Sequence, residues 1–338
     1  MKWIRSCLVA ASTILIWSPG GQAADATNYK LIQRIKVPDG GFDYATFDAA
    51  ANKVYMPRGS FTTVIDPNTG AISQFAHGES NHIALPVPGT NLLVLTQGGK
   101  GIVRILDKTS DKVLADLPAG KNPNSAAYDP VTKLVFVMNK ESGNTSVVDP
   151  SARKIVDTIS ISPNVLEFPV ADGHGRIFDN VETTAEIAVI DARSRKLTTT
   201  YKMPGCERPS GLAYAPDSNL LISSCRNGTA KILQADSGKE VASIPIGAGP
   251  DAAIYDQRRK LAFIPCGGDG VMDIISLADA EHPTLVQKVV TQAGSRTGTL
   301  DPNTGRVYLM ASKPDPAAGG GRGAPRLAGS WEVLVFGP

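Results

Sequence analysis

Residues 112–149, KVLADLPAGKNPNSAAYDPVTKLVFVMNKESGNTSVVD, contain four short apolar runs separated by residues that favour turns. The runs are Lys112–Leu117, Ser125–Tyr128, Lys133–Met138 and Thr145–Val148. Short β-branched and aliphatic runs bounded by Asn, Pro, Gly, Asp and Ser are typical of antiparallel strands joined by tight turns. A four-stranded sheet of this kind has two apolar faces, so it needs neighbouring sheets to cover both.

The residue that ends this stretch recurs along the chain at nearly constant spacing. Its equivalents are Asp66, Asp107, Asp149, Asp191, Gln234 and Ser276, 41 to 43 residues apart. A lysine that opens the next apolar run follows four of these positions, as Lys112, Lys154, Lys196 and Lys239. A four-strand repeat of about 42 residues predicts a β-propeller, in which each repeat forms one blade.

The two ends of the chain predict how the ring closes. The last unit has the strands Arg296–Leu300, Arg306–Ala311 and Trp331–Phe336, and no outer strand follows before Pro338. Tyr29–Val37 has the pattern of an outer strand but no sheet precedes it. Pairing this strand with the last sheet would leave neither edge open. We therefore expect an all-β fold of seven blades, with four antiparallel strands each and the N-terminal strand closing the last blade.

Residues 1–23 have the pattern of a secretory signal peptide. Lys2 and Arg5 precede the apolar run Cys7–Trp17, and small residues before Ala24 allow cleavage. The apolar run is too short to span a bilayer, and Cys7 is not placed to carry a lipid, so no membrane anchor is expected. Residues 24–338 are expected to form a single propeller domain that is periplasmic or secreted.

The charge balance argues against nucleic acid or an anionic membrane as a partner. The chain has 34 basic and 32 acidic residues, and residues 1–23 hold two basic and no acidic ones. The remainder is therefore formally neutral, with no basic run that aromatic residues interrupt.

Three cysteines follow the predicted signal, and their pairing is left open by the sequence. Cys206 and Cys225 lie in two loops of the fifth blade that are expected on one face, and Cys266 lies in the corresponding loop of the sixth. An exported protein can keep a disulfide between Cys206 and Cys225. The alternatives are Cys225–Cys266 and, less favoured, a metal site built from all three thiolates.

Two segments depart from the repeat. The fourth blade has Val165-Leu166-Glu167-Phe168 where other blades have small residues, and its second strand contains Asp179 and Asn180. The Pro/Gly-rich segment 313–329, KPDPAAGGGRGAPRLAG, is inserted between the second and third strands of the seventh blade. Its composition favours a flexible surface loop, and a lid over the channel mouth is the alternative.

The repeats VIDPNTG, VVDPSARK and VIDARSRK resemble those of the YVTN-type (YncE-like) family of exported seven-bladed propellers. The resemblance runs from Tyr29 to Phe336 and implies the fold and export, but no single reaction. The resemblance also implies one possible function, that of an accessory protein in a periplasmic quinone-dependent dehydrogenase system, which stands third after the two given below. Redox relatives carry Cys-x-x-Cys-His, which this chain lacks, so covalent haem is not expected.

Propeller ligands bind where the first strands converge at the channel mouth. The residues that open these strands are all polar: Asp43, His82, Asn124, Glu167, Arg208, Asp251 and Arg296. Arg58, Asn139, Arg226, Asn227 and Asp269 surround them in the loops between the second and third strands. Each also has a structural explanation, such as turn formation for Asp43, Asn124 and Asp251 or blade packing for His82. Glu167 is the hardest to explain in this way, because a carboxylate between apolar neighbours needs a partner.

Two classes of function follow from this set. The first is a binding or scaffold module for a small polar or anionic ligand or a periplasmic protein, in which Arg208, Arg226 and Arg296 supply charged hydrogen bonds. The second is a metal-assisted hydrolase or lyase of lactone type. In that scheme Asn124, Glu167 and Asp251 would hold a divalent cation through oxygen ligands. The catalytic candidates would be His82, Glu167 and Arg296. No motif here has diagnostic spacing, so the binding module is the preferred hypothesis and the cofactor stays unknown.

Overall fold

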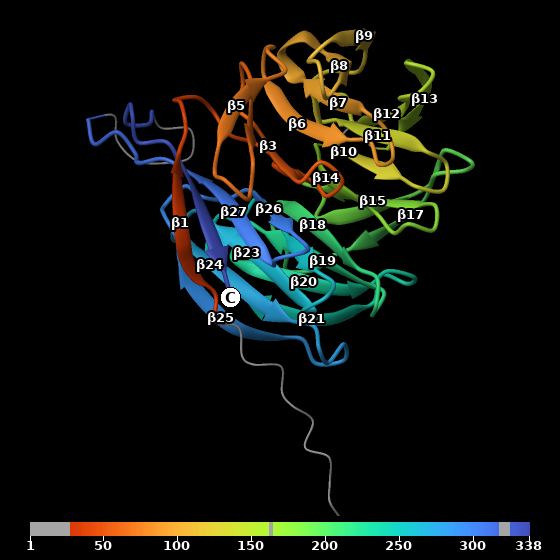
Figure 1. The fold of residues 1–338 in the computed structure, drawn as a ribbon. Helices are drawn as coiled ribbons and strands as arrows, with labels where there is room; N and C mark the ends of the chain where they lie inside the picture. Colours follow the sequence, from red (N-terminus) through yellow and green to blue (C-terminus); the bar gives the residue numbers. More distant parts are fainter. Residues whose placement is uncertain (1–27, 162–164, 318–324) are drawn as a thin grey trace, which may run out of the picture.

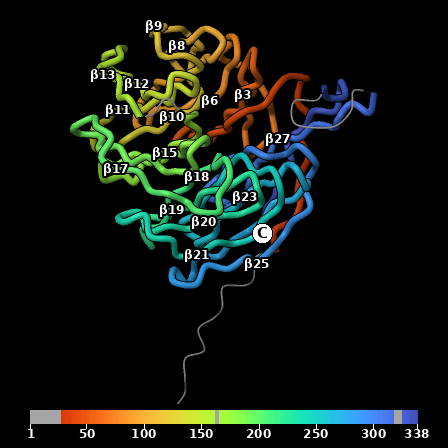
Figure 2. Tube along the Cα trace, turned by 180° about the vertical axis from the view of Figure 1, so that it is seen from behind, coloured from red at the N-terminus to blue at the C-terminus, as the bar shows by residue number. Residues whose placement is uncertain are grey.

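The computed structural model describes residues 28–161, 165–317 and 325–338, so the predicted signal peptide lies outside the described residues. The described residues form seven four-stranded antiparallel sheets, which confirms the predicted seven-bladed β-propeller. Figure 1 shows the blades following one another around the ring, and Figure 2 shows from behind that the end of the chain returns to its start. The described helical residues form one turn, Gly98–Lys100, and no helix is long and apolar enough to span a membrane.

Each blade begins at the channel and ends at the rim. The first strands are β2 (Thr46–Asp48), β6 (Asn81–Pro86), β10 (Pro123–Asp129), β14 (Leu166–Ala171), β18 (Pro209–Ala215), β22 (Ile254–Asp256) and β26 (Gly298–Asp301). The second strands are β3 (Lys53–Pro57), β7 (Leu92–Gln97), β11 (Leu134–Asn139), β15 (Arg176–Val181), β19 (Leu220–Cys225), β23 (Leu261–Cys266) and β27 (Arg306–Ala311).

The remaining strands complete each sheet outward. The third strands are β4 (Thr62–Ile65), β8 (Ile102–Asp107), β12 (Asn144–Asp149), β16 (Glu186–Asp191), β20 (Thr229–Gln234), β24 (Val271–Ser276) and β28 (Glu332–Gly337). The fourth strands are β5 (Ile72–Phe75), β9 (Val113–Pro118), β13 (Lys154–Ser160), β17 (Lys196–Lys202), β21 (Glu240–Pro245), β25 (Thr284–Val290) and β1 (Lys30–Lys36).

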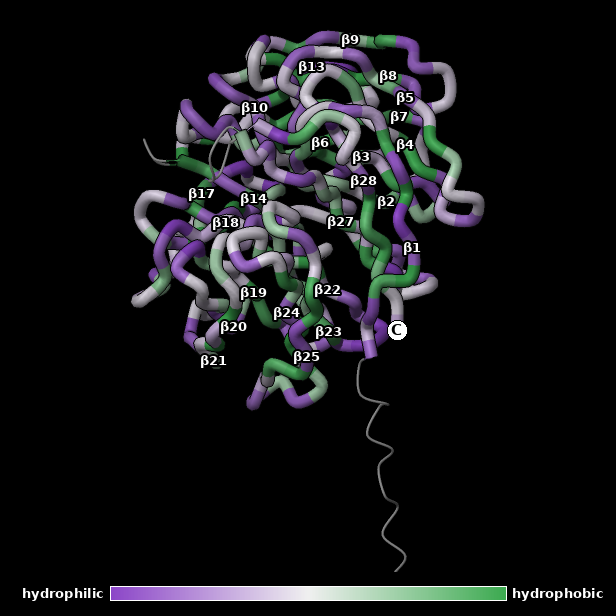
Figure 3. Tube along the Cα trace, turned by 90° about the vertical axis from the view of Figure 1, so that its left-hand side faces the viewer, coloured by the Kyte–Doolittle hydropathy of each residue, from purple (hydrophilic) through white to green (hydrophobic). Residues whose placement is uncertain are grey.

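The N-terminal strand closes the ring as predicted. β1 pairs antiparallel with β28, in a register that runs from Lys30 opposite Gly337 to Lys36 opposite Glu332. The two strands lie side by side in Figure 3, where β1 changes repeatedly between hydrophilic and hydrophobic residues. The first strands contact one another in cyclic order, from β2 through β26 and back to β2. Closure therefore leaves neither end of the described chain as an unpaired sheet edge at the junction.

The apolar core is divided among the blade interfaces. The described residues form seven apolar clusters, one between each pair of adjacent blades. Between blades three and four, for example, Phe136 and Met138 pack with Ile177 and Val181. Each sheet thus buries both of its apolar faces against its neighbours, which is the requirement that the repeat imposed.

The repeated aspartate closes the turn between the third and fourth strands. In blade two, Asp107 Oδ1 accepts hydrogen bonds from the backbone N–H groups of Thr109 at 3.0 Å and Ser110 at 2.9 Å. Asp66 accepts the equivalent pair from Asn68 and Thr69. A short acidic side chain that bonds to its own following backbone stabilises such a turn. The Thr109 hydroxyl also donates to Asp107 Oδ1 at 2.6 Å, and this bond together with the backbone bonds lowers the pKa of Asp107 to about 2.

Blade one departs from its predicted boundaries in a way that shapes the channel mouth. The sequence predicts a first strand from Phe42 to Phe47, but β2 begins at Thr46. Tyr44, which precedes β2, bonds to the next blade instead. Its N–H donates to the His82 carbonyl at 3.1 Å, and it forms a parallel bridge with Ile83.

The insertion lies between β27 and β28, as predicted, and its described arms bond to each other. Asp315 N donates to the Pro325 carbonyl and Leu327 N to the Lys313 carbonyl, both at 3.0 Å. Residues 318–324 lie outside the described residues, so neither the flexible loop nor the lid is tested there.

Candidate functional site

The candidate site lies at the face where the first strands begin and the second strands end, called the mouth face below. Glu167, the second residue of β14, is 1% exposed and reaches across the channel. Its Oε2 accepts a hydrogen bond from the Tyr44 hydroxyl at 3.0 Å, and its Oε1 contacts Lys140 Nζ at 2.5 Å. Tyr44 belongs to blade one and Glu167 to blade four, the largest separation that a seven-bladed ring allows. The polar groups therefore close the channel at this level instead of lining an open mouth.

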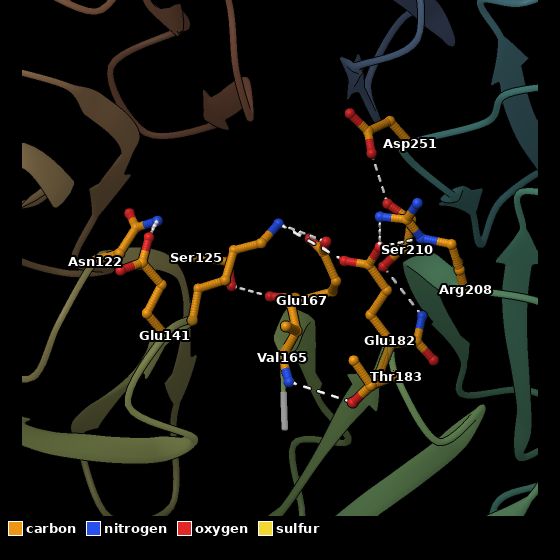
Figure 4. A network of polar contacts seen from close by, with 12 residues as sticks. Asn122, Ser125, Glu141, Val165, Glu167, Glu182, Thr183, Arg208, Ser210 and Asp251 are labelled. Carbon is orange, nitrogen blue, oxygen red and sulfur yellow. Dashed lines mark hydrogen bonds and ion pairs between the residues drawn. The ribbon is translucent and has the colours of Figure 1, made fainter. Parts of the chain in front are cut away.

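A second glutamate extends the cluster toward blade five. Glu182 follows β15 and hydrogen-bonds with Glu167, and the two carboxyl groups point toward each other in Figure 4. Arg208 Nε donates to Glu182 Oε1 at 2.5 Å, and Arg226 NH1 approaches the same oxygen at 3.1 Å. Lys140 Nζ lies 3.9 Å from Glu182 Oε2. Three cationic side chains thus converge on one carboxylate.

The surroundings of the two glutamates shift their pKa values in opposite directions. Burial, followed by the hydrogen bond with Glu182, raises the pKa of Glu167 to about 8 despite Lys140. Burial also disfavours the charge of Glu182, but the hydrogen bond with Glu167 and the nearby Arg226 and Arg208 lower its pKa to about 2. Near neutral pH the pair therefore holds one proton and one negative charge. Because Lys140, Arg208 and Arg226 face that single charge, the cluster has a local excess of positive charge.

Asp251 carries the network on to blades six and seven. Ser210 Oγ donates to Asp251 Oδ1 at 2.6 Å, and Arg296 Nε donates to Oδ2 at 2.8 Å. Arg226 NH2 lies 4.0 Å from Asp251 Oδ1. Four of the seven residues predicted from the sequence, namely Glu167, Arg208, Asp251 and Arg296, are thereby brought into one network.

The other three predicted residues lie outside it. Asp43 Oδ2 and His82 Nδ1 are 2.5 Å apart and form a separate pair between blades one and two. Asn124 is 5% exposed, and its Oδ1 has no hydrogen-bond partner among the described residues. Its backbone carbonyl accepts a hydrogen bond from Thr96 Oγ1 at 2.7 Å.

Sequence reasoning missed Lys140 and Glu182, although a signal for them exists. Both are the first residue after a second strand, and Arg58 and Arg226 occupy the same place in their blades. Reading this position blade by blade would have found them. Tyr44 and Ser210 were also missed, because the positions next to a strand opening carry no comparable pattern.

The disulfide joins the two loops that present the arginines. Cys206 and Cys225 are bonded, as predicted, and Cys266 is a buried free thiol, so the Cys225–Cys266 pairing is wrong. The three-thiolate site is wrong for the same reason, because two of its sulfurs are already bonded to each other. Arg208 comes two residues after Cys206, and Arg226 directly follows Cys225. The bridge therefore fixes the bases of both side chains relative to each other.

A pocket of about 640 Å³ opens beside this bridge. Its charged lining consists of Lys140, Glu182, Glu207, Arg208 and Arg226, and Cys206 forms part of its wall. Arg208 has a backbone φ of 52°, which lies in the left-handed region. The equivalent residue of blade six is Gly249, which has a φ of 65°. This conformation is not confined to the mouth, because φ values of 55–61° also occur in the turns between strands at Lys133, Arg153, Arg195 and Lys260.

The metal site of Asn124, Glu167 and Asp251 stays a prediction, and its two carboxylates have cationic partners in the structure. The carboxylates of Glu167 and Asp251 already contact Lys140 and Arg296, respectively. Among the residues that the structure describes, no group of three or more His, Cys, Asp or Glu residues could hold a metal ion. This arrangement does not favour a divalent cation, and no chemical step below depends on one.

Comparisons with known proteins show the fold alone. No protein-family model matches the chain, and no curated protein matches it. Hydrazine synthase of Kuenenia stuttgartiensis is similar in structure, with a TM-score of 0.73 and 15% identity over 81% of this chain and 94% of that chain. A chain in the crystal structure of a mitotic checkpoint complex is similar with a TM-score of 0.74 and 15% identity over 99% of both chains. At this identity, both likenesses extend to the seven-bladed propeller and no further.

Proposed function

We propose that the protein is an exported binding module that takes a small anionic ligand, one bearing carboxylate groups, in the pocket beside Cys206. The observation that carries the proposal is the convergence of Lys140, Arg208 and Arg226 on Glu182 at the wall of that pocket. Arginine presents planar, paired donors that match a carboxylate, and such charged hydrogen bonds are stronger than neutral ones. The disulfide supports export, since disulfides persist in oxidising compartments. Membership of the YncE-like family is part of this proposal and rests on the repeat motifs.

Arg208 is the residue that best tests the proposal, because 62% of its side chain is exposed and it can be removed with little loss of packing. Calorimetric titration with mono-, di- and tricarboxylates should find a ligand whose binding weakens about tenfold to a hundredfold in Arg208→Gly. Glycine is chosen because it accepts the left-handed backbone at this position. Folding is therefore spared while the charge is lost.

Arg258→Ala is the matched control. Arg258 is an exposed arginine in the turn between β22 and β23, at the face opposite the mouth. The Arg258→Ala variant should bind the ligand with the same affinity as the unchanged protein. Equal affinity in Arg208→Gly would contradict the proposal, as would a panel in which no carboxylate binds. Binding only to an acidic protein segment would replace the small ligand by a protein partner, the other class expected from the sequence.

Hydrolase or lyase activity of lactone type is the second candidate, and the Asp43–His82 pair favours it. A carboxylate bonded to one imidazole nitrogen orients the ring, so that the other nitrogen can face a substrate and take its proton. Turnover of a lactone panel that His82→Gln abolishes, while ligand binding at Arg208 persists, would establish this reaction. No turnover by the unchanged protein would exclude it for those substrates.

A further inference from the structure

A separate pocket lies where the insertion meets blades seven and one. Its volume is about 430 Å³, and its walls include Phe42, Trp331 and Pro325 together with Arg296 and Arg326. Phe42 and Trp331 pack edge to face, with ring centroids 5.8 Å apart. The pocket thus combines an apolar, aromatic wall with two guanidinium groups. Figure 1 shows the dark-blue described arms of the insertion projecting beside the upper end of the red strand β1.

The two arginines of this pocket bring like charges together. Arg296 lies with its guanidinium carbon 4.5 Å from the centre of the Phe42 ring. Arg326 forms no ion pair with any described residue, and burial, followed by the nearby charge of Arg296, lowers its pKa. A side chain on residue 294 would meet the Arg326 guanidinium at 2.9 Å, so Gly294 leaves the space in which it lies. Two adjacent guanidinium groups are stabilised when an anion binds between them.

A third cation lies behind the aromatic wall. Arg58 is 1% exposed and its guanidinium carbon lies 4.7 Å from the centre of the Trp331 ring. It donates to the carbonyls of Gly41 at 2.6 Å and Pro38 at 2.7 Å, which are neutral partners. Asp39 is the carboxylate at the rim, and its oxygens accept hydrogen bonds from the backbone of Gly329. The surroundings of this pocket therefore have more positive than negative side chains, namely Arg58, Arg296 and Arg326 against Asp39.

The base of the insertion is fixed at this point, which holds Arg326 in place. Its arms bond to each other at Lys313–Leu327 and Pro325–Asp315. Lys313 N also donates to Ser330 Oγ at 3.0 Å. Together with the Asp39–Gly329 contact, these bonds tie the insertion to the start of blade one.

We propose that this pocket is a second binding site, for a small carboxylic acid with a planar apolar body. The carboxylate lies between Arg296 and Arg326, and the body packs against Phe42 and Trp331. The apolar wall favours such an acid over inorganic phosphate, which would have to give up more hydration without gaining apolar contact. Arg296 also bonds to Asp251, so the second site adjoins the network of the proposed function without sharing its pocket.

The fluorescence of Trp331 reports directly on occupancy. The chain has three tryptophans, Trp3, Trp17 and Trp331, so the Trp3→Phe/Trp17→Phe variant of the full chain keeps one, in the pocket wall. Titration with benzoate and naphthoate should change its emission saturably, with naphthoate binding more tightly, whereas phosphate should not. In the same background, Arg326→Ala should weaken binding about tenfold to a hundredfold, and Arg326→Lys should weaken it less.

Two controls separate this site from the first. Lys313→Ala removes an exposed cation from the same insertion without touching the pocket wall and should leave the titration unchanged. Arg208→Gly should also leave it unchanged, since Arg208 lines the other pocket. A fluorescence change that survives Arg326→Ala, or the absence of any aromatic-acid response, would overturn the second site while leaving the first standing. If phosphate competed as well as benzoate, the claim that the ligand needs a planar apolar body would be wrong.

Discussion

The carboxyl groups at the two ends of the blades have opposite surroundings. At the face away from the mouth, Asp66 and Asp107 lie in exposed turns. A hydrogen bond from a side chain, Lys53 for Asp66 and Thr109 for Asp107, together with those from the following backbone, lowers the pKa of each to about 2. At and below the mouth, Glu167 and Asp179 are buried, and burial is the largest cause of their raised pKa values. The turn aspartates recur every 41 to 43 residues, whereas the buried carboxyl groups of the mouth network, Glu167, Glu182 and Asp251, lie in blades four and six and follow no such period.

This difference separates residues that form the fold from residues that could serve a ligand. A turn aspartate stabilises its own following backbone, so each blade can carry one independently of its neighbours. A buried carboxyl group needs partners from other blades, as Glu167 has in Tyr44 and Lys140. Glu167 therefore lies where the ring brings those partners together.

The largest expected effect on stability concerns the disulfide. It links two loops at the mouth face, whereas the aspartate turns at the other face are held by hydrogen bonds. Replacing both Cys206 and Cys225 by Ser should lower the free energy of unfolding by about 3 kcal/mol, because the bridge closes a loop of 19 residues. It should also weaken ligand binding, since Arg208 and Arg226 lose their common anchor. Denaturation with urea and calorimetric titration measure the two effects. Unchanged stability under reducing conditions would show that the loops hold without the bridge.

Removal of one carboxyl group from each end should also give unequal effects. Glu167→Ala should lower the free energy of unfolding by about 2–3 kcal/mol, because it leaves Lys140 and the Tyr44 hydroxyl without their partner and opens a cavity across the channel. Asp107→Ala should change it much less, because water can replace hydrogen bonds in an exposed turn. Equal losses in urea denaturation would mean that the turns, and not the mouth network, dominate the stability of these blades.

The sequence predicted the far face better than the mouth, and the reason is physical. The 42-residue period fixes the turns and the number of blades, because each depends on neighbours in the chain. It also places Glu167, Arg208, Asp251 and Arg296 at one face, since every first strand begins there. It could not pair Glu167 with Tyr44, because the two lie 123 residues apart and meet only when the ring is closed.

The pocket of the insertion was also beyond sequence reasoning. Its composition favoured a flexible loop, yet the described arms are bonded to each other and to Asp39. These bonds involve backbone groups, which no side-chain pattern reveals. The position of Arg326 beside Arg296 depends on them.

Replacing Asp179 in β15 should have a smaller effect on the free energy of unfolding, and this effect should be stabilising. Its carboxyl group is fully buried, and neither oxygen has a hydrogen-bond partner among the described residues. Blades two, three and seven have Leu95, Val137 and Leu309 at the equivalent place of the second strand. Asp179→Val should therefore raise the free energy of unfolding by about 1–2 kcal/mol, since it removes a buried polar group that gains nothing in return. A loss of stability in chemical denaturation would show that the carboxyl group has a partner in solution.

The dependence of stability on pH should distinguish the two ends in a single experiment. The turn aspartates have a pKa of about 2 when folded and 3.8 as the ordinary value, so they bind fewer protons in the folded state. Stability should therefore rise with pH between about 2 and 4, and Glu182, whose pKa is also about 2, adds to this rise. Glu167 has a folded pKa of about 8 against an ordinary 4.5, so the folded state binds more protons. Its contribution should make stability fall as pH rises from about 4.5 to 8.

Matched amide variants assign each slope to its end of the molecule. In urea denaturation at a series of pH values, Glu167→Gln should flatten the fall above pH 4.5 and leave the rise at low pH unchanged, because a glutamine cannot ionise. Asp107→Asn should do the reverse, reducing the rise at low pH alone. Asp179, whose pKa burial also raises, contributes a fall that both proteins share. A fall above pH 4.5 that is as large in Glu167→Gln as in the unchanged protein would mean that Lys140 keeps Glu167 ionised in the folded protein. The proton shared with Glu182 would then be absent, and the excess of positive charge at the proposed binding pocket would be smaller by one.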